Sequence, residues 1–308
     1  MNFDLMRLIA AALVVVSHVF PLSGRPPFTI MGVEDLGALG VSVFFVISGY
    51  LVTASYLRDP KAYLLNRLLR IEPGLIASLI LTVVVLGFVT NAAAGDYWPA
   101  AAMYVIRNAL LYPATYHLPG VFEAAPVAGV VNGVLWTLRL EFTFYLVLML
   151  IRARLALILV LLAVCTGVFL VMSVTHPGWA DERATRIAYL AARNGMLFFA
   201  GAAMQLWGAR TPLWLGLGSA AAFPWLGPLA LPTAVLGLAR PGRLPADLSY
   251  GIYIYAFPIQ QMLALRGELT LISSLALVIP VAALSWFLIE KPALRFKPGS
   301  RSETVQQD

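Results

Sequence analysis

Residues 3–20, FDLMRLIAAALVVVSHVF, form an apolar run long enough to cross a membrane as one α-helix, yet the run carries Arg7 and His18. A helix turns about 100° and rises about 1.5 Å per residue, so eleven positions return His18 to within about 20° of the Arg7 face, roughly 16 Å further along. A charge at mid-bilayer costs on the order of 2.5 to 3.5 kcal/mol, so this shared stripe predicts a functional site. The alternative is that Arg7 reaches the lipid headgroups and His18 is a packing residue.

The composition excludes a soluble domain. The 308 residues are 60% hydrophobic and 12% charged, with a mean hydropathy of +0.84, whereas soluble domains are about 45 to 50% apolar. The apolar segments have the length of membrane helices and lack the alternation of barrel strands. Cys165 is the single cysteine, so we expect no intrachain disulfide and no metal site. The basic residues are scattered between apolar segments, which argues against a nucleic-acid partner.

We therefore expect an all-α polytopic membrane protein with about ten transmembrane helices in one bundle. The expected spans are 3–21, 37–57, 74–91, 133–151, 155–174, 189–207, 211–225, 226–239, 248–265 and 269–289. Residues 1–290 would form the membrane domain and 291–308 a short basic tail. The segment 211–239 is short for two crossings, and Pro224 and Pro228 interrupt it, so nine spans remain an alternative.

The distribution of basic residues predicts the orientation. With the N-terminus in the cytoplasm, thirteen Lys and Arg residues fall in inside segments and five in outside segments. The positive-inside rule then places both termini in the cytoplasm. The longest outside segment, 92–132, begins with aromatic residues beside a short apolar stretch, and we expect an interfacial or re-entrant helix there.

Three further stretches place polar groups beside the first span. Residues 40–51, GVSVFFVISGYL, combine small residues with aromatic ones, which indicates close helix packing. Ser48 as a nucleophile would need a nearby base. In residues 66–73, NRLLRIEP, Arg67 and Arg70 share a helix face and could bind the phosphates of a cytosolic donor such as a coenzyme A thioester. The alternative is that these arginines only set the orientation.

The third stretch, residues 136–145, WTLRLEFTFY, contains Arg139 and Glu141 two positions apart, on different helix faces. We expect Glu141 to seek Arg7, His18 or Arg193 on other helices, because an unpaired buried charge is costly. A purely structural ion pair is the alternative. The segment 176–181, HPGWAD, matches a His-x4-Asp acyltransferase spacing on the wrong face of the membrane, and we interpret this match as chance.

Together these stretches resemble the acyltransferase-3 family of integral membrane acyltransferases over nearly the whole chain. The segments that carry the resemblance are DLMR with His18 (4–18), FFVISGYL (44–51), NRLLRIEP (66–73), WTL with Glu141, Phe144 and Tyr145 (136–145), and LSYGIY (248–253). The resemblance implies a ten-span fold and transfer of an acyl group, usually acetyl, from cytosolic acyl-CoA to a hydroxyl of an envelope glycan or lipid-linked sugar. The chain departs from the family at Phe257, before Pro258, where a histidine is common.

The resemblance implies that Arg7 and His18 belong to the active site and that Arg67 and Arg70 lie near the donor. His18 suits a general base near neutral pH. Arg7 would steady the donor or the developing oxyanion, and Glu141 would orient His18 or Arg7. We assign Ser48 and Tyr50 to the donor site as well, and Trp136 and Tyr145 to substrate contacts.

We therefore predict a multi-pass acetyltransferase of the bacterial cytoplasmic membrane that contacts membrane lipids. A secondary transporter with an Arg, His and Glu relay and a non-catalytic scaffold are the alternatives.

Overall fold

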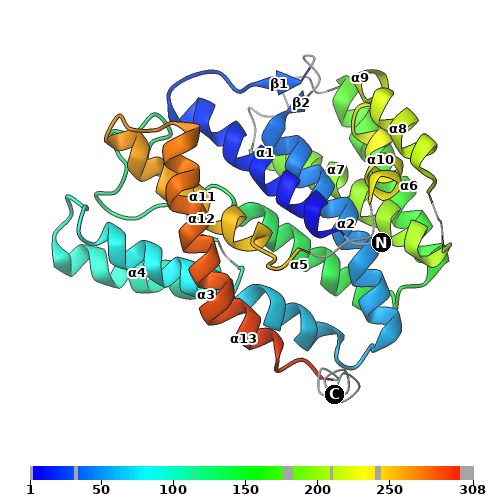
Figure 1. The fold of residues 1–308 in the computed structure, drawn as a ribbon, viewed down its shortest axis with the longest axis horizontal. Helices are drawn as coiled ribbons and strands as arrows, with labels where there is room; N and C mark the ends of the chain where they lie inside the picture. The colour runs from blue at the N-terminus through cyan, green and yellow to red at the C-terminus, as the bar shows by residue number, and fades with distance from the viewer. Residues whose placement is uncertain are drawn as a thin grey trace.

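A computed structural model describes residues 3–30, 34–112, 114–175, 183–208, 211–239 and 244–298. Helices dominate it, as expected, and a short antiparallel pair of strands, β1 and β2, follows the first helix (Figure 1). The elements are α1 (Asp4–Leu22), β1 (Thr29–Ile30), β2 (Glu34–Asp35), α2 (Leu36–Arg58), α3 (Tyr63–Leu86), α4 (Ala94–Ala109), α5 (Leu135–Leu150), α6 (Leu155–Thr175), α7 (Arg183–Leu206), α8 (Leu213–Ala221), α9 (Phe223–Leu226), η1 (Gly227–Ala230), α10 (Leu231–Leu238), α11 (Ser249–Leu265), α12 (Leu271–Ser285), η2 (Trp286–Glu290) and α13 (Lys291–Leu294).

Six helices of the described residues are long and apolar enough to cross a membrane, and a bent helix pair would bring the number to seven. The six lie at Asp4–Leu22, Leu36–Arg58, Tyr63–Leu86, Leu155–Thr175, Ala184–Leu206 and Leu271–Leu294. The expected count of about ten is not supported by helix length, because α5 has 16 residues and α11 has 17, while a full crossing needs about 20.

The third span differs from its predicted bounds of 74–91. The helix α3 already begins at Tyr63 and ends at Leu86, with Pro73 inside it. A proline is tolerated within a membrane helix, because neighbouring groups can satisfy the backbone carbonyl that it leaves free. Arg67 and Arg70 therefore lie in the first turns of this long helix rather than before it.

The segment 211–239 folds back on itself. A break between α8 and the chain that follows bends it by 57°, and α8 then packs against α10 through two glycines. A Cβ atom added to Gly216 would lie 2.7 Å from the Gly237 backbone, and one added to Gly237 would lie 3.2 Å from the Pro212 carbonyl. The segment therefore ends beside the place where it begins.

Glycines let the central helix α2 approach its neighbours closely, as the small residues of the second span predict. A Cβ atom on Gly40 would lie 2.4 Å from the Ala10 carbonyl oxygen of α1, and one on Gly49 would lie 1.9 Å from the Phe198 carbonyl oxygen of α7. Asp35 caps the start of α2 by accepting from the backbone N–H groups of Gly37 and Ala38.

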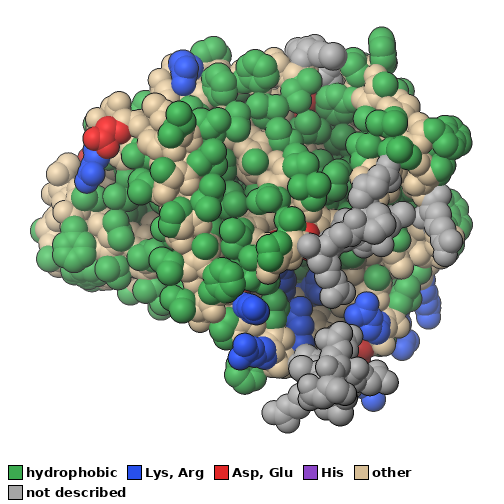
Figure 2. Space-filling model, in the orientation of Figure 1, with side chains coloured by type: hydrophobic (Ala, Val, Ile, Leu, Met, Phe, Trp, Pro, Cys, Tyr) green, Lys and Arg blue, Asp and Glu red, His purple; other side chains and the backbone are tan. Residues whose placement is uncertain are grey.

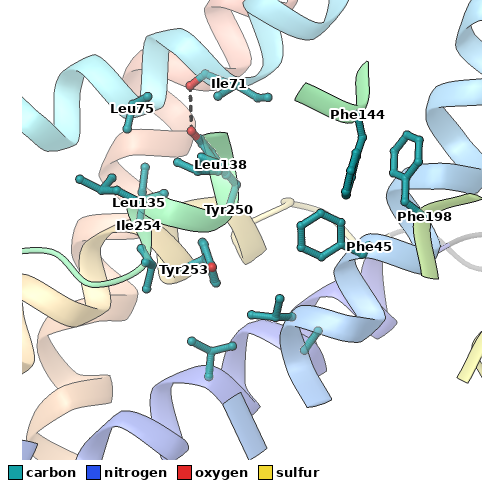
Figure 3. Close-up of a cluster of buried hydrophobic side chains, with 14 of the residues drawn as sticks. Phe45, Ile71, Leu75, Leu135, Leu138, Phe144, Phe198, Tyr250, Tyr253 and Ile254 are labelled. Carbon is teal, nitrogen blue, oxygen red and sulfur yellow. Dashed lines mark hydrogen bonds between the residues drawn. The ribbon is translucent and has the colours of Figure 1, made fainter. Parts of the chain in front are cut away.

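Aromatic side chains hold α2, α5 and α7 together (Figure 3). The Phe144 ring lies 5.8 Å from the Phe45 ring and 5.4 Å from the Phe198 ring, within the range of favourable aromatic pairs. In the same view the Tyr250 hydroxyl of α11 donates to the Ile71 carbonyl of α3 at 2.9 Å. These contacts fix α5 and α11 against the helices that carry the arginines.

The surface has an apolar belt and one basic end. Figure 2 shows hydrophobic side chains over most of the face, with Lys and Arg side chains gathered along the lower edge, near the start of α3 and near α13. Residues 299–308 of the predicted tail, the segment 176–181, and Arg210, Arg240 and Arg243 of the charge count lie outside the described residues.

Candidate functional site

Two neighbouring cavities contain most of the residues that the sequence singles out. We name the first the arginine cavity. It has a volume of about 100 Å³ and is formed by α1, α2, α3, α5 and α11. Its lining residues are Arg7, Val41, Phe44, Phe45, Ile47, Ser48, Leu51, Val52, Arg67, Arg70, Ile71, Thr137, Leu138, Glu141, Tyr145, Tyr250 and Tyr253.

An ion-pair chain joins Arg7 of α1 to Arg70 of α3 beside the arginine cavity and ends at Glu290, beyond α12. Arg7 Nη1 and Arg70 Nη2 both donate to Asp247 Oδ2, at 2.9 and 2.5 Å. The other nitrogen, Arg70 Nη1, lies 3.5 Å from Glu290 Oε2. Ser249 donates to Asp247 Oδ1 at 2.6 Å. Burial raises the pKa of Asp247, but Arg7, Arg70 and the Ser249 hydrogen bond outweigh it, so the net pKa lies below its usual value.

A second polar cluster occupies the α2–α5 side of the arginine cavity. Ser48 Oγ and the Tyr145 hydroxyl both donate to Glu141 Oε1 at 2.5 Å. Ser48 therefore has the carboxylate partner that the sequence could not show. Glu141 makes no ion pair with Arg7, His18 or Arg193 in the described residues. That expected pairing is wrong, because two hydroxyls satisfy this carboxylate and Arg193 binds Glu34 instead.

Positive charge exceeds negative charge at the basic end of the arginine cavity. Arg67 Nε is buried without a hydrogen-bond partner among the described residues. Burial, then the charges of Arg67, Arg70 and Arg7, lower the pKa of Lys297 to about 8. Four cations therefore converge where Asp247, Glu290 and Glu141 supply three carboxylates, an arrangement suited to a polyanion.

We name the second cavity the histidine cavity. It has a volume of about 660 Å³ and lies on the side of β1 and β2, away from the basic end. Its lining residues are Val14, Ser17, His18, Pro21, Pro27, Thr29, Glu34, Asp35, Gly37, Ala38, Val41, Gly133, Val134, Trp136, Tyr189, Leu190, Arg193 and Tyr253.

His18 lines this cavity, and one of its ring nitrogens has no hydrogen-bond partner among the described residues. This nitrogen, Nδ1, is buried. The edge of its ring contacts Phe257 of α11, with ring centroids 5.1 Å apart. Phe257 is the residue at which the chain departs from the pattern it otherwise resembles. An aromatic side chain therefore supports His18 where a second histidine would have been expected.

Acidic and aromatic groups complete the histidine cavity. Arg193 of α7 donates to Glu34 Oε1 and, at 2.6 Å, to Ser42 Oγ. Glu34 Oε2 is buried without a partner among the described residues. Burial raises the pKa of Glu34, and the Arg193 charge offsets part of that effect. Trp136 also lines this cavity.

The predicted site residues are divided between the two cavities. Arg7, Arg67, Arg70, Ser48, Glu141 and Tyr145 line the arginine cavity, whereas His18 and Trp136 line the histidine cavity. Tyr50 lines neither of them and packs its ring 5.5 Å from Phe3. Arg139 points away from Glu141, toward the Tyr112 ring, as the two-residue spacing predicts.

Sequence reasoning missed Asp247, Glu290, Glu34, Tyr253 and Lys297. The signals for Asp247 and Glu290 were an acidic residue directly before the predicted span 248–265 and another directly after the predicted span 269–289. The short loop that contains Glu34 carries no such signal.

Comparison with known proteins agrees with the resemblance found in the sequence. A family model described as an acyltransferase domain, the acyltransferase-3 model, matches residues 2–246. An "O-acetyl transferase" of Shigella phage Sf6 is 29% identical, with 94% of each chain aligned. "Nodulation protein 10" of Rhizobium leguminosarum bv. viciae is 30% identical, over 96% of this chain and 94% of the relative. No solved structure matches the chain.

Proposed function

The chain belongs to the acyltransferase-3 family, and we propose that it moves an acetyl group from cytosolic acetyl-CoA to a hydroxyl of an envelope glycan or lipid-linked sugar, with His18 as general base. The observation that carries this proposal is the pair of adjoining cavities, one rich in arginine and one containing His18. A transferase that joins substrates from two compartments needs two such sites with a common boundary.

The donor fits the arginine cavity. Coenzyme A carries several phosphates, and guanidinium groups bind phosphate with two parallel hydrogen bonds. Arg67 has an unpartnered nitrogen there, and Lys297 adds a further amine. At about 100 Å³ the arginine cavity has no room for a nucleotide, so only the thioester end of the pantetheine arm would enter it. The phosphates would therefore remain at the basic end while the thioester extends toward Tyr253.

The acceptor fits the histidine cavity. Carboxylates and aromatic rings are the groups that hold hydroxylated rings, and Glu34, Asp35 and Trp136 supply them. In the transfer step the acceptor oxygen attacks the thioester carbonyl carbon while His18 takes the hydroxyl proton. The carbon–sulfur bond then breaks, and coenzyme A leaves as a thiolate that takes up a proton.

The position of Arg7 suits binding of the donor better than stabilisation of the oxyanion at the reacting carbonyl. Arg7 and His18 are eleven residues apart on α1, which is roughly 16 Å along the axis. Arg7 is also held by Asp247 at the basic end. Of its two predicted roles, we therefore propose that Arg7 positions the donor.

We also propose ten membrane passages, eight full crossings and the two short legs of the segment 211–239, with both termini in the cytoplasm of a bacterium and the protein in the inner membrane. The short helices α5 and α11 would each cross, and the segment 211–239 would enter and leave on the same side. The contact between Gly216 and Gly237 supports that return. An even number of crossings then puts the C-terminal helix α13 beside the basic start of α3, as the positive-inside rule requires. Reporter fusions at both ends test this orientation.

The test of the function uses purified protein in liposomes with bacterial envelope glycolipids and acetyl-CoA labelled in the acetyl group. We expect label on a glycolipid, and His18→Ala should lower that rate about 10² to 10⁴-fold. His117→Ala is the matched control, because His117 is exposed and lines neither cavity. A fully active His18→Ala protein would refute the role of His18. Movement of an unaltered solute would favour a transporter instead.

A further inference from the structure

Tyr253 stands between the two cavities. Among the described residues, only Val41 and Tyr253 line both the arginine cavity and the histidine cavity. Tyr253 is 6% exposed, so its ring is part of the packed interior. These two side chains therefore form the wall that separates the two halves of the site.

The Tyr253 ring is held in place from two directions. Its hydroxyl lies 2.5 Å from Thr137 Oγ1. Because Thr137 uses its own proton on the Val134 carbonyl at 2.8 Å, Tyr253 must be the donor in this pair. The Phe44 ring contacts the Tyr253 ring edge-on, with centroids 5.4 Å apart. A side chain fixed in this way closes the passage between the arginine cavity and the histidine cavity for as long as it keeps this position.

The wall separates two cavities that differ in polarity and size, and this separation affects access of water to the donor. About 660 Å³ lined by Glu34, Asp35, Arg193 and His18 has room for on the order of twenty waters, at about 30 Å³ each. A general base that activates an alcohol also activates water, and exclusion of water is how enzymes prevent hydrolysis of reactive groups. A thioester open to this cavity would lose its acyl group.

We propose that Tyr253 is a positioning residue that keeps the donor thioester away from water in the histidine cavity, so that the acyl group passes to the acceptor rather than to water. This inference rests on the proposed function. The acceptor, when it fills the histidine cavity, displaces that water and brings its hydroxyl to the wall. The side reaction is hydrolysis of acetyl-CoA, in which water adds to the carbonyl carbon, the carbon–sulfur bond breaks, and acetate and the free thiol leave.

The experiment measures acetate release from labelled acetyl-CoA by the purified full-length protein without acceptor. Tyr253→Ala should raise hydrolysis by about tenfold or more, and adding His18→Ala should remove that gain, because the base is lost. Tyr253→Phe keeps the ring but loses the hydrogen bond to Thr137, so its gain should be smaller than that of Tyr253→Ala. A gain of hydrolysis that disappears when His18 is also replaced requires a folded site.

Tyr255→Ala is the matched control. Tyr255 lies on the same helix α11, is 4% exposed, and donates to Ser285 Oγ away from both cavities. Val41→Ala shortens the other side chain of the wall. It replaces Tyr253→Ala as the test variant if Tyr253→Ala does not fold. Wild-type hydrolysis in a wall variant that still binds acetyl-CoA would overturn the inference, as would an equal gain in Tyr255→Ala. A wild-type protein that neither binds acetyl-CoA nor transfers its acetyl group would instead overturn the proposed function.

Discussion

Replacement of Asp247 by asparagine removes the carboxylate that both Arg7 and Arg70 bind. Because the two arginine nitrogens contact the same oxygen at 2.9 and 2.5 Å, they are at most 5.4 Å apart. Two unit charges at that separation or less repel by at least about 3 kcal/mol at an effective dielectric constant of about 20, and the Asp247 carboxylate offsets this repulsion in the wild type. The three side chains are 14 to 21% exposed, so water screens part of this repulsion. We expect Asp247→Asn to lower the free energy of unfolding by about 2 to 3 kcal/mol, below the value for a fully buried pair.

The assay is equilibrium unfolding in mixed micelles, followed by tryptophan fluorescence, for the wild type, Asp247→Asn, Arg7→Gln and the double variant. Arg7→Gln removes one of the two repelling charges, so the double variant should be more stable than Asp247→Asn by about 1 kcal/mol or more. Additive losses from the two substitutions would refute the electrostatic reasoning.

The same ion pair predicts a pH dependence. The folded-state pKa of Asp247 lies below its usual 3.8, so its stabilisation is complete above about pH 4 and is lost as the pH falls through the folded-state value. The stability difference between the wild type and Asp247→Asn should therefore disappear in acid. A difference that persists there would point to a loss of packing rather than of charge.

Two further predictions concern the basic end and the helix packing. Binding of polyanionic acetyl-CoA should raise the pKa of Lys297 from about 8, so the affinity of the wild type should fall between about pH 7 and 9, while Lys297→Gln should bind with little pH dependence in titration calorimetry. The pH affects stability in the opposite direction from affinity. In the unfolded chain Lys297 keeps its proton up to its usual pKa of 10.5, so the free energy of unfolding increases as the pH rises above 8. Gly49→Ala puts a methyl group 1.9 Å from the Phe198 carbonyl oxygen and should lower the free energy of unfolding by about 1 to 3 kcal/mol. Gly167→Ala in α6 is the control, because its added Cβ would meet no neighbouring helix within 4 Å. It should unfold like the wild type in the same micelle assay.

Local patterns in the sequence predicted several features of the site. The three-residue spacing of Arg67 and Arg70 put both on one helix face, and both line the arginine cavity. The two-residue spacing of Arg139 and Glu141 separated them correctly. These predictions depend only on the helical period, which packing does not change.

Contacts between helices were not predictable in the same way. Asp247 lies 240 residues from Arg7 and 177 from Arg70, and the helical period of α1 gives no information about its partner. The expected pairing of Glu141 with a charged residue was wrong because Ser48 and Tyr145 hydroxyls approach it from α2 and from one turn along α5. Tyr50 lies in the predicted stretch but faces Phe3 instead of the arginine cavity.

Composition and segment length were enough to predict that this chain folds as membrane helices with ionisable residues on the first of them. A long apolar segment in lipid must satisfy its backbone hydrogen bonds within itself, and that requirement depends only on composition and length. Only the packed helices reveal that Arg7 and His18 line different cavities and that Tyr253 lines both of them. Two residues on nearly one face of a helix can still meet different neighbours 16 Å apart, because the depth at which other helices cross α1 follows from packing across the whole bundle.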